Sequence, residues 1–404
     1  MQNKNVVRSL VGLGFLAMFL SSAFKGVFQV YFNDLALSFE RGRSDFGFVG
    51  GVFLLVSGLA SPMVGALSDR FGPIWTVLIG SVLGGGAFLL LGLLPHQYWL
   101  FVILYGLLAA FSLAAMTFVP MGILVDRLFD QKNKSFAYAL ITNGTAIGFI
   151  VLSPFWLWLQ AHFEWQQVFF VVGLLFLGPL ALLFWLGARV PLPAKESVGH
   201  IQEKRVGTWP VVLRDPGFYV LAFGFFGCGA SMAFIDVHLV PLWRDAGVSR
   251  ASMGMSLSLF GVLEMISGLV AGWLALRFSQ YRLLAAFYVL RCLAMSLLLA
   301  PSGIVTTYVF AAVFGASYLG TVILTSAICL DRYGGAVKGQ VFGMLFLVHQ
   351  IGAFGSAQLG AYGYDRLGSY QATVMVLAML TAIAGISSLF LSSVAFRRTQ
   401  SEFN

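Results

Sequence analysis

Gly65-Ala66-Leu67-Ser68-Asp69-Arg70-Phe71-Gly72 is a short stretch whose two charges separate two long apolar runs. The runs extend from Phe46 to Leu67 and from Ile74 to Leu94, and neither contains a charged residue. About 20 apolar residues are enough for a helix to cross a membrane, and a backbone in lipid must satisfy its own hydrogen bonds, which favours helices. The stretch is therefore predicted to be a tight polar loop at a membrane surface, whose glycines let two helix ends approach closely.

A weaker copy of this stretch occurs in the second half of the chain. It reads Gly272-Trp273-Leu274-Ala275-Leu276-Arg277 and is displaced by 207 positions, from 65 to 272. A second landmark, Asp126-Arg127, recurs as Asp331-Arg332, displaced by 205 positions, from 126 to 331. Two pairs at nearly the same offset, about half of the chain, indicate an internal duplication.

The composition is that of a membrane protein with many spans. Of 404 residues, 59% are hydrophobic and only 10% are charged, which is far from the composition of a soluble domain. The apolar run at the N-terminus continues to Phe32, long enough to span the membrane rather than to act as a cleaved signal peptide. We predict twelve spanning helices, near residues 9–32, 46–66, 74–94, 98–125, 135–159, 167–188, 216–242, 252–276, 281–300, 303–330, 338–362 and 370–395.

These spans predict an all-α membrane protein made of two six-helix bundles. The expected divisions are 1–188 for the first bundle, 189–215 for a polar linker and 216–404 for the second bundle. Glycines are frequent in the spans and are expected mainly at positions where helices pack closely.

The distribution of Lys and Arg predicts the orientation. The face opposite the termini holds Arg41, Arg43, Arg244, Arg250 and Arg366, and two further basic residues lie inside spans, so the other 17 of the 24 lie on the side of the termini. Positive charge in short loops is retained in the cytoplasm. We therefore expect both termini and the linker in the cytoplasm of a bacterial inner-membrane protein, and we attribute the net charge of +8 to topology rather than to a nucleic-acid partner.

Ionisable groups inside the predicted spans are the candidate functional residues, because such groups cost at least a few kcal/mol in a bilayer. They are Lys25, Asp236, His238, Glu264, Arg291 and His349.

Lys25 and Glu264 are the main candidates for substrate and proton binding. Lys25 lies deep in the first span, where its ammonium suits a carboxylate, although its long side chain could also reach the outer interface. Glu264 lies midway along the eighth span, where desolvation favours the protonated form of a carboxylate and proton exchange becomes possible. The alternative for Glu264 is a fixed ion pair with Arg291 or Lys25.

The other intramembrane groups have weaker assignments. Arg291 is a candidate for substrate binding, but structural pairing is the more expected role. His349 and Gln350 offer a titratable ring beside an amide, for substrate binding or for helix packing. Asp236 is a second candidate for proton coupling, and with His238 it lies near the outer end of the seventh span, where both could form a gate or an interface.

Other functional classes find no support in the sequence. It has no Walker loop, no dinucleotide fingerprint and no Cys/His cluster with metal spacing, so we expect no enzyme activity, no cofactor and no metal. The three cysteines, Cys228, Cys292 and Cys329, lie in apolar segments and are expected to be packing residues.

The opening stretch resembles the signature G-x-x-x-D-R-x-G of the major facilitator superfamily, carried here by Gly65, Asp69, Arg70 and Gly72. In the second copy Leu276 replaces the acidic residue. The resemblance implies two pseudo-symmetric six-helix bundles around a central cavity that opens alternately to each side. It also implies that these four residues control conformational gating on the cytoplasmic side.

Within the superfamily, the chain resembles the bacterial monocarboxylate and oxalate–formate porter group. The stretches that carry this likeness are Lys25, Ser44 to Gly65, His238-Leu239, Tyr288 to Arg291, His349 to Ala353 and Tyr364 to Tyr370.

Monocarboxylate porters are known for a first-helix lysine, matched by Lys25, and for an eighth-helix acid with an arginine four residues later. Glu264 matches the acid, but the position four later is Gly268, so that arginine is missing. The fifth-helix pattern of drug/proton antiporters is absent, since Gly148 is followed by a proline only at Pro154.

Together these features predict a monomeric secondary transporter that moves a small organic anion with protons. The alternatives are a transporter or exporter of a larger amphipathic solute, such as a siderophore or a drug, and a sensor with a porter fold that binds its ligand without moving it.

Overall fold

The structure, a computed structural model, describes residues 4–94, 97–192, 209–333 and 335–401, and within them it contains helices and no strand. Ten of these helices are long and apolar enough to cross a membrane, or eleven when a bent pair is counted as one span. A further helix, α14 (Gln280–Leu297), has 18 residues and includes two arginines, so it is less apolar than the others. The prediction of an all-α membrane protein is confirmed, and twelve spans are consistent with these helices.

The chain divides into two compact units, Met1–Ser197 and Val198–Asn404. Residues 193–208 of the predicted linker lie outside the described residues, and its last part, Trp209–Arg214, forms the short helix α11. In the first unit, which we call the N-terminal half, the helices are α1 (Lys4–Ser38), α2 (Arg43–Leu59), α3 (Ser61–Phe71), α4 (Pro73–Leu93), α5 (Tyr98–Phe101), η1 (Val102–Ala109), α6 (Ala110–Met116), α7 (Phe118–Leu128), α8 (Gln131–Gln160), α9 (Trp165–Leu175), η2 (Phe176–Leu180) and α10 (Ala181–Ala188).

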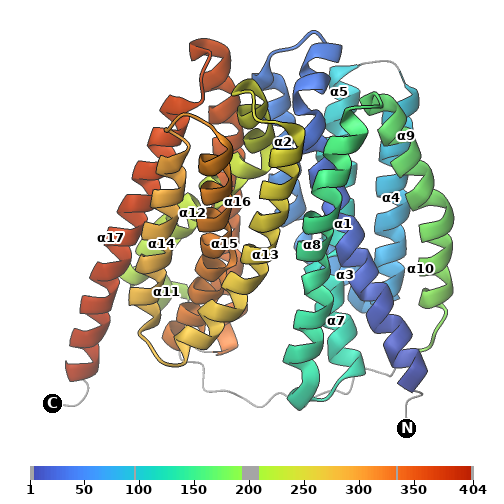
Figure 1. The fold of residues 1–404 in the computed structure, drawn as a ribbon. Coiled ribbons are helices and arrows are strands. Elements are labelled where there is room, and N and C mark those ends of the chain that lie inside the picture. Colours follow the sequence, from blue (N-terminus) through green and yellow to red (C-terminus); the bar gives the residue numbers. More distant parts are fainter. Residues whose placement is uncertain (1–3, 95–96, 193–208, 334, 402–404) are drawn as a thin grey trace. The chain divides into compact units, whose positions relative to one another are not determined.

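The second unit, the C-terminal half, has one long helix for most of its spans. Its helices after α11 and besides α14 are α12 (Pro216–Asp245), α13 (Arg250–Ala275), α15 (Ile304–Tyr333), α16 (Gly335–Leu367) and α17 (Gln371–Ser401). The helix α14 packs against both α15 and α17 (Figure 1).

The signature stretch is not a loop, which corrects the sequence prediction. Gly65 to Phe71 form the last turns of α3, and only Gly72 interrupts the helix before Pro73 begins α4. Gly72 has φ of 104°, a conformation that side chains disfavour and glycine tolerates. A bend that was not predicted lies earlier, where α2 and α3 meet at 46° around Ala60.

The first and fifth spans of each half pack tightly through glycines. In the N-terminal half α1 lies against α8, and a Cβ on Gly144 of α8 would come within 2.5 Å of the Phe15 carbonyl oxygen. In the C-terminal half α12 lies against α16, and a Cβ on Gly352 would collide with the Phe226 carbonyl. Small residues allow such close contact between spanning helices, and the same pairing in both halves agrees with the duplication.

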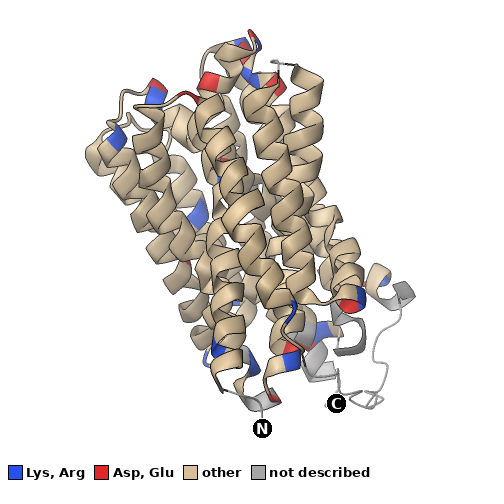
Figure 2. Ribbon diagram, turned by 90° about the vertical axis from the view of Figure 1, so that its right-hand side faces the viewer, with Lys and Arg blue, Asp and Glu red and all other residues tan. Residues whose placement is uncertain are grey.

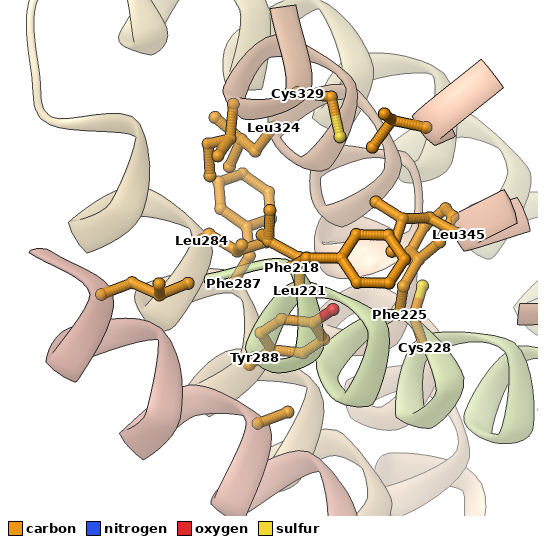
Figure 3. Close-up of a cluster of buried hydrophobic side chains, with 14 of the residues drawn as sticks. Phe218, Leu221, Phe225, Cys228, Leu284, Phe287, Tyr288, Leu324, Cys329 and Leu345 are labelled. Atoms are coloured by element: carbon orange, nitrogen blue, oxygen red, sulfur yellow. The ribbon is translucent and has the colours of Figure 1, made fainter. Parts of the chain in front are cut away.

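Each half has its own buried core. In the N-terminal half Tyr105 stacks on Phe28 and Phe53, with ring centroids 4.6 and 4.7 Å apart, and its hydroxyl donates to the Phe24 carbonyl at 2.8 Å. In the C-terminal half a cluster that includes Phe225, Cys228 and Tyr288 joins α12, α14, α15 and α16 (Figure 3).

Charged residues gather toward the ends of the helices, with few between them (Figure 2). Large apolar side chains such as Leu269, Leu182 and Phe390 remain exposed along the spans, as expected for surfaces that face lipid rather than water.

Candidate functional site

The conformational-gating candidates lie at the junction of α3 and α4. Asp69 and Arg70 are exposed, and the Arg70 guanidinium lies 5.2 Å from the centroid of the Phe71 ring. The junction itself is held by Thr76, whose hydroxyl accepts from Ser68 and donates to the Gly72 carbonyl, each at 3.0 Å.

A polar face on α1 surrounds Lys25. Lys25, Gln29 and Asn33 follow one another at intervals of four residues, so they share one side of the helix. Lys25 is half-buried, and Gln29 is 3% exposed. This face carries a positive charge together with amide groups inside a span, a combination suited to binding an anion.

Trp156 of α8 packs beside this face and was not identified from the sequence. A Cβ on Gly26, the neighbour of Lys25, would lie 3.0 Å from the indole Nε1 of Trp156. Trp156 is 5% exposed, and its Nε1 has no hydrogen-bond partner among the described residues. A buried donor without a partner costs free energy, so this N–H is available to a ligand. The sequence gives only a weak signal for a functional role of Trp156, because a tryptophan in a span is usually a packing residue.

Arg291 is the centre of a polar network in the C-terminal half. It is fully buried, and Nη2 donates to the carbonyls of Ser317 and Tyr318 at 2.5 and 2.8 Å. Nη1 lies 3.0 Å from the Cys228 sulfur and 3.5 Å from the Ser231 hydroxyl. These acceptors are two backbone carbonyls, a hydroxyl and a cysteine sulfur on α12 and α15, so the guanidinium holds the two helices together.

Tyr318 brings two of the predicted acids into the same network. Its hydroxyl donates to Asp236 of α12 at 3.2 Å, and it interacts electrostatically with Glu264 of α13. Asp236 and Glu264 are both half-buried. Tyr318 was missed because it carries no charge at neutral pH, and a search for intramembrane charges passes over it.

The two histidines lie on the α12–α16 side of the same half. Nδ1 of His349 is 3.0 Å from Oε1 of Gln350, and the His349 ring lies 4.7 Å from that of Phe225. His238 is fully buried, and its Nε2 is 2.8 Å from the Ala357 carbonyl. Cys228, expected to be a packing residue, is buried but also accepts from Arg291.

An ion pair joins the end of α15 to the start of α12 in the C-terminal half. Arg332 at the end of α15 binds both carboxylate oxygens of Asp215, which precedes α12, with Nη2 to Oδ1 at 2.6 Å. Burial disfavours the charge of Asp215, but the hydrogen bonds from Arg332, the Gly217 backbone and Tyr333 outweigh it and lower the pKa of Asp215 to about 2. In the N-terminal half, the corresponding landmark Asp126 pairs with Lys134 at 3.0 Å.

The structure thus brings Asp236, Glu264 and Arg291 together around Tyr318, whereas Lys25 belongs to the polar face of the other half. Within the part of the chain that the structure describes, no group of three or more His, Cys, Asp or Glu residues is arranged to hold a metal ion.

Two repeated six-helix units with ionisable groups inside their spans define a class, the helical membrane transporters. The sequence model of the Major Facilitator Superfamily matches residues 14–245. The chain is also 31% identical, over 82% of its length and 81% of the relative's, to the uncharacterized MFS-type transporter YcxA of Bacillus subtilis (strain 168). The chain belongs to the Major Facilitator Superfamily, a family of transporters.

Two further likenesses are informative. Monocarboxylate transporter 13 of Bos taurus is 28% identical over 64% of this chain and 59% of its own length. A bacterial homolog of the human lysosomal transporter Spinster, solved in an inward-facing and unoccupied conformation, has the same fold, with a TM-score of 0.70 at 14% identity over 96% of this chain and 95% of its own.

Proposed function

We propose that this transporter moves a small organic anion of the monocarboxylate type together with protons across the cytoplasmic membrane. The transport cycle would be alternating access, in which the two halves rock. The observation that carries the proposal is the presence of two half-buried acids inside the spans, Glu264 and Asp236, the second of which accepts a hydrogen bond from the Tyr318 hydroxyl at 3.2 Å.

The N-terminal half supplies the groups for the anion. Lys25 offers a positive charge in the span, and the Trp156 indole offers a buried donor beside it. A carboxylate accepts hydrogen bonds and pairs with an ammonium, so both groups suit a carboxylate substrate. The likeness to a relative named as a monocarboxylate transporter favours the same substrate class.

The C-terminal half supplies the groups for the proton. A carboxylate within a span gains and loses a proton more readily near neutral pH than one in water, since burial disfavours its charge. Glu264 is the proposed carrier, with Asp236 beside it. In this assignment Arg291 supports the helices rather than the substrate, because groups of the protein itself occupy its donors.

The test is uptake by purified protein in liposomes, with a panel of radiolabelled monocarboxylates and dicarboxylates and with or without an imposed proton gradient. Gradient-driven accumulation of a monocarboxylate is expected, and Lys25→Ala and Glu264→Gln should each reduce it by about tenfold or more. Tyr308→Phe, on α15 and outside the network, serves as the control.

Two results would refute the proposal. One is an unchanged rate and pH dependence in both Lys25→Ala and Glu264→Gln. The other is the absence of accumulation of every anion in vesicles that contain folded protein, in which case competition by larger amphipathic solutes would identify the alternative substrate class.

A further inference from the structure

Arg291 is a fully buried cation that pairs with no carboxylate within the described residues. Its five hydrogen bonds there go to the carbonyls of Ser317 and Tyr318, to the hydroxyls of Ser317 and Ser231, and to the sulfur of Cys228. A buried charge without a counter-charge is strongly destabilising. One of the groups in contact with the guanidinium is therefore expected to carry the opposite charge.

Cys228 is the acidic group among these contacts. Its sulfur is fully buried and lies 3.0 Å from Nη1 of Arg291. The Thr321 hydroxyl lies 3.2 Å from both this sulfur and the Tyr318 carbonyl. Because that carbonyl already accepts from Arg291, the sulfur is the better acceptor for the hydroxyl. Hydrogen bonds to an ionised group are shorter than those between neutral groups, and both contacts are short for an atom as large as sulfur.

A neutral thiol suits this position less well than a thiolate. Its proton would go to the Met232 sulfur, 3.5 Å away, but a thioether is a weak acceptor. The sulfur of a thiol is itself a weak acceptor, so the charge of Arg291 would stay unbalanced. An adjacent arginine favours the thiolate, and a thiolate beside the guanidinium gives a pair that is neutral as a whole.

The other titratable groups that pack around Cys228 supply no negative charge. Tyr288 of α14 belongs to the same buried cluster (Figure 3). His349 of α16 lies against Gly229, where a Cβ would come within 2.9 Å of the ring carbon Cγ. Tyr318 of α15 contacts Arg291 through its carbonyl. Tyrosine is neutral and histidine is neutral or positive near neutral pH, so none of the three can balance the guanidinium.

The acids of α12 and α13 are not direct partners of Arg291 either. Asp236 accepts from the hydroxyl of Tyr318, at the opposite end of that residue from the carbonyl that Arg291 binds. Neither Asp236 nor Glu264 is among the groups that accept from Arg291 within the described residues. Cys228 is thus the acidic group that touches the cation.

We propose that Cys228 is a thiolate and the counter-charge of Arg291, and that the resulting ion pair clamps α12 to α14. The guanidinium also binds two carbonyls of α15, so the clamp joins three helices of the C-terminal half. It holds α12 and α15 in the register at which Asp236 meets the Tyr318 hydroxyl. The thiol proton leaves to water as the pair forms, and no other group changes its charge. The clamp depends neither on the substrate nor on proton coupling.

The decisive experiment measures the infrared S–H stretching band of the purified protein at neutral pH. The chain has three cysteines, so one thiolate leaves two S–H groups in the wild type. Cys329→Ser, a matched change at another fully buried cysteine, should remove about half of the band, because it removes one of two thiols. Cys228→Ser should leave the band unchanged. Loss of about a third of the band in each variant, as for three thiols, overturns the proposal.

A double variant keeps the clamp itself unaltered. In Cys292→Ser/Cys329→Ser, Cys228 is the remaining cysteine of the chain and Arg291 is in place. The folded variant should show no S–H band, and a band should appear after unfolding in acid, which proves that the sulfur was not oxidised. An S–H band in the folded variant overturns the proposal.

Thermal unfolding in detergent tests the role of the pair. Cys228→Ser leaves the buried cation unbalanced and should lower the unfolding temperature by about 5 °C or more. Cys228→Asp restores a negative charge and should recover most of this loss, although aspartate resembles cysteine in shape less than serine does. Cys329→Ser should cost less than half as much as Cys228→Ser. If Cys228→Asp is no more stable than Cys228→Ser, the cysteine acts through packing and the clamp is refuted.

Discussion

At the residue scale, the two basic residues inside predicted spans, Arg291 and Lys25, differ in their surroundings. Arg291 is fully buried, and its planar guanidinium donates to several acceptors of the protein at once. Lys25 is half-buried on a polar helix face beside an unused indole donor. A buried cation needs its donors satisfied, and the protein itself supplies the acceptors for Arg291, which suits a structural role.

Asp215 gives a residue-scale prediction for stability. Its side chain is 8% exposed and that of Arg332 is 9% exposed, so Asp215→Asn leaves a largely buried arginine without its partner. We expect a loss on the order of 3 kcal/mol and a lower unfolding temperature in detergent, followed by tryptophan fluorescence. Asp331→Asn is the matched control, because Asp331 is exposed and accepts only from Gln280 in the described structure.

The pH dependence of this effect follows from the lowered pKa of Asp215. A group whose pKa falls from 3.8 to about 2 on folding stabilises the protein above its unfolded pKa, and this stability is lost as the pH falls through the folded pKa. The difference between wild type and Asp215→Asn should therefore stay constant from about pH 8 to about pH 5. A difference that shrinks within this range would contradict the assignment.

At the element scale, close helix pairs depend on individual glycines. A Cβ on Gly148 would collide with the Phe19 carbonyl and come within 2.5 Å of the Ser22 hydroxyl of α1. A Cβ on Gly86 of α4 would meet nothing within 4 Å. The two glycines thus have different roles, although each lies inside an apolar span.

Substitution of these two glycines by alanine should have opposite consequences. Gly148→Ala should destabilise the pair α1 and α8 by about 1–3 kcal/mol, because the helices must separate to admit the methyl group. Gly86→Ala should be neutral or slightly stabilising, because alanine favours the helix. Thermal unfolding of the two variants side by side checks this, and equal losses would refute the packing argument.

The signature stretch also belongs to the element scale. Two charges and two glycines in eight residues indicate a break between apolar runs, and the sequence reading extended that break over the whole stretch. In the structure the helix α3 continues through Asp69 and Arg70 and ends only at Gly72. A backbone near lipid is most stable when its hydrogen bonds are made within a helix. Gly65 lies inside α3 and does not interrupt it. A Cβ there would meet only Val119, at an ordinary contact distance of 3.7 Å.

At the scale of the whole molecule, the distribution of Lys and Arg predicts the orientation in the membrane. Ser249 and Ser279 flank α13 and are both exposed, so cysteines at these positions report on opposite faces. In intact cells a membrane-impermeant maleimide should label Ser249→Cys, whereas Ser279→Cys should react only after permeabilisation. The wild type is the control, because Cys228 and Cys329 are buried and Cys292 is half-buried within the helix α14. The reverse pattern would place the termini outside.

The charged residues of the candidate site could be predicted from the sequence because the spans themselves could be predicted. Lys25, Asp236, Glu264 and Arg291 are conspicuous because charges are rare in apolar runs. Tyr318 and Trp156 are common aromatic residues in such runs, and only their partners distinguish them. Asp236 and Tyr318 are separated by 82 residues along the chain, yet their side chains meet at 3.2 Å.

The sequence by itself determined that this protein is an all-α membrane protein with a duplicated set of spans, because apolarity over some 20 residues is a local property that lipid converts directly into a helix. A short signature also indicated the family, and the basic residues predict an orientation that the labelling experiment tests. Only the tertiary structure decided which intramembrane groups meet, because that depends on how each helix is rotated and packed. This packing brings the Tyr318 hydroxyl to Asp236 and the Tyr318 backbone carbonyl to Arg291.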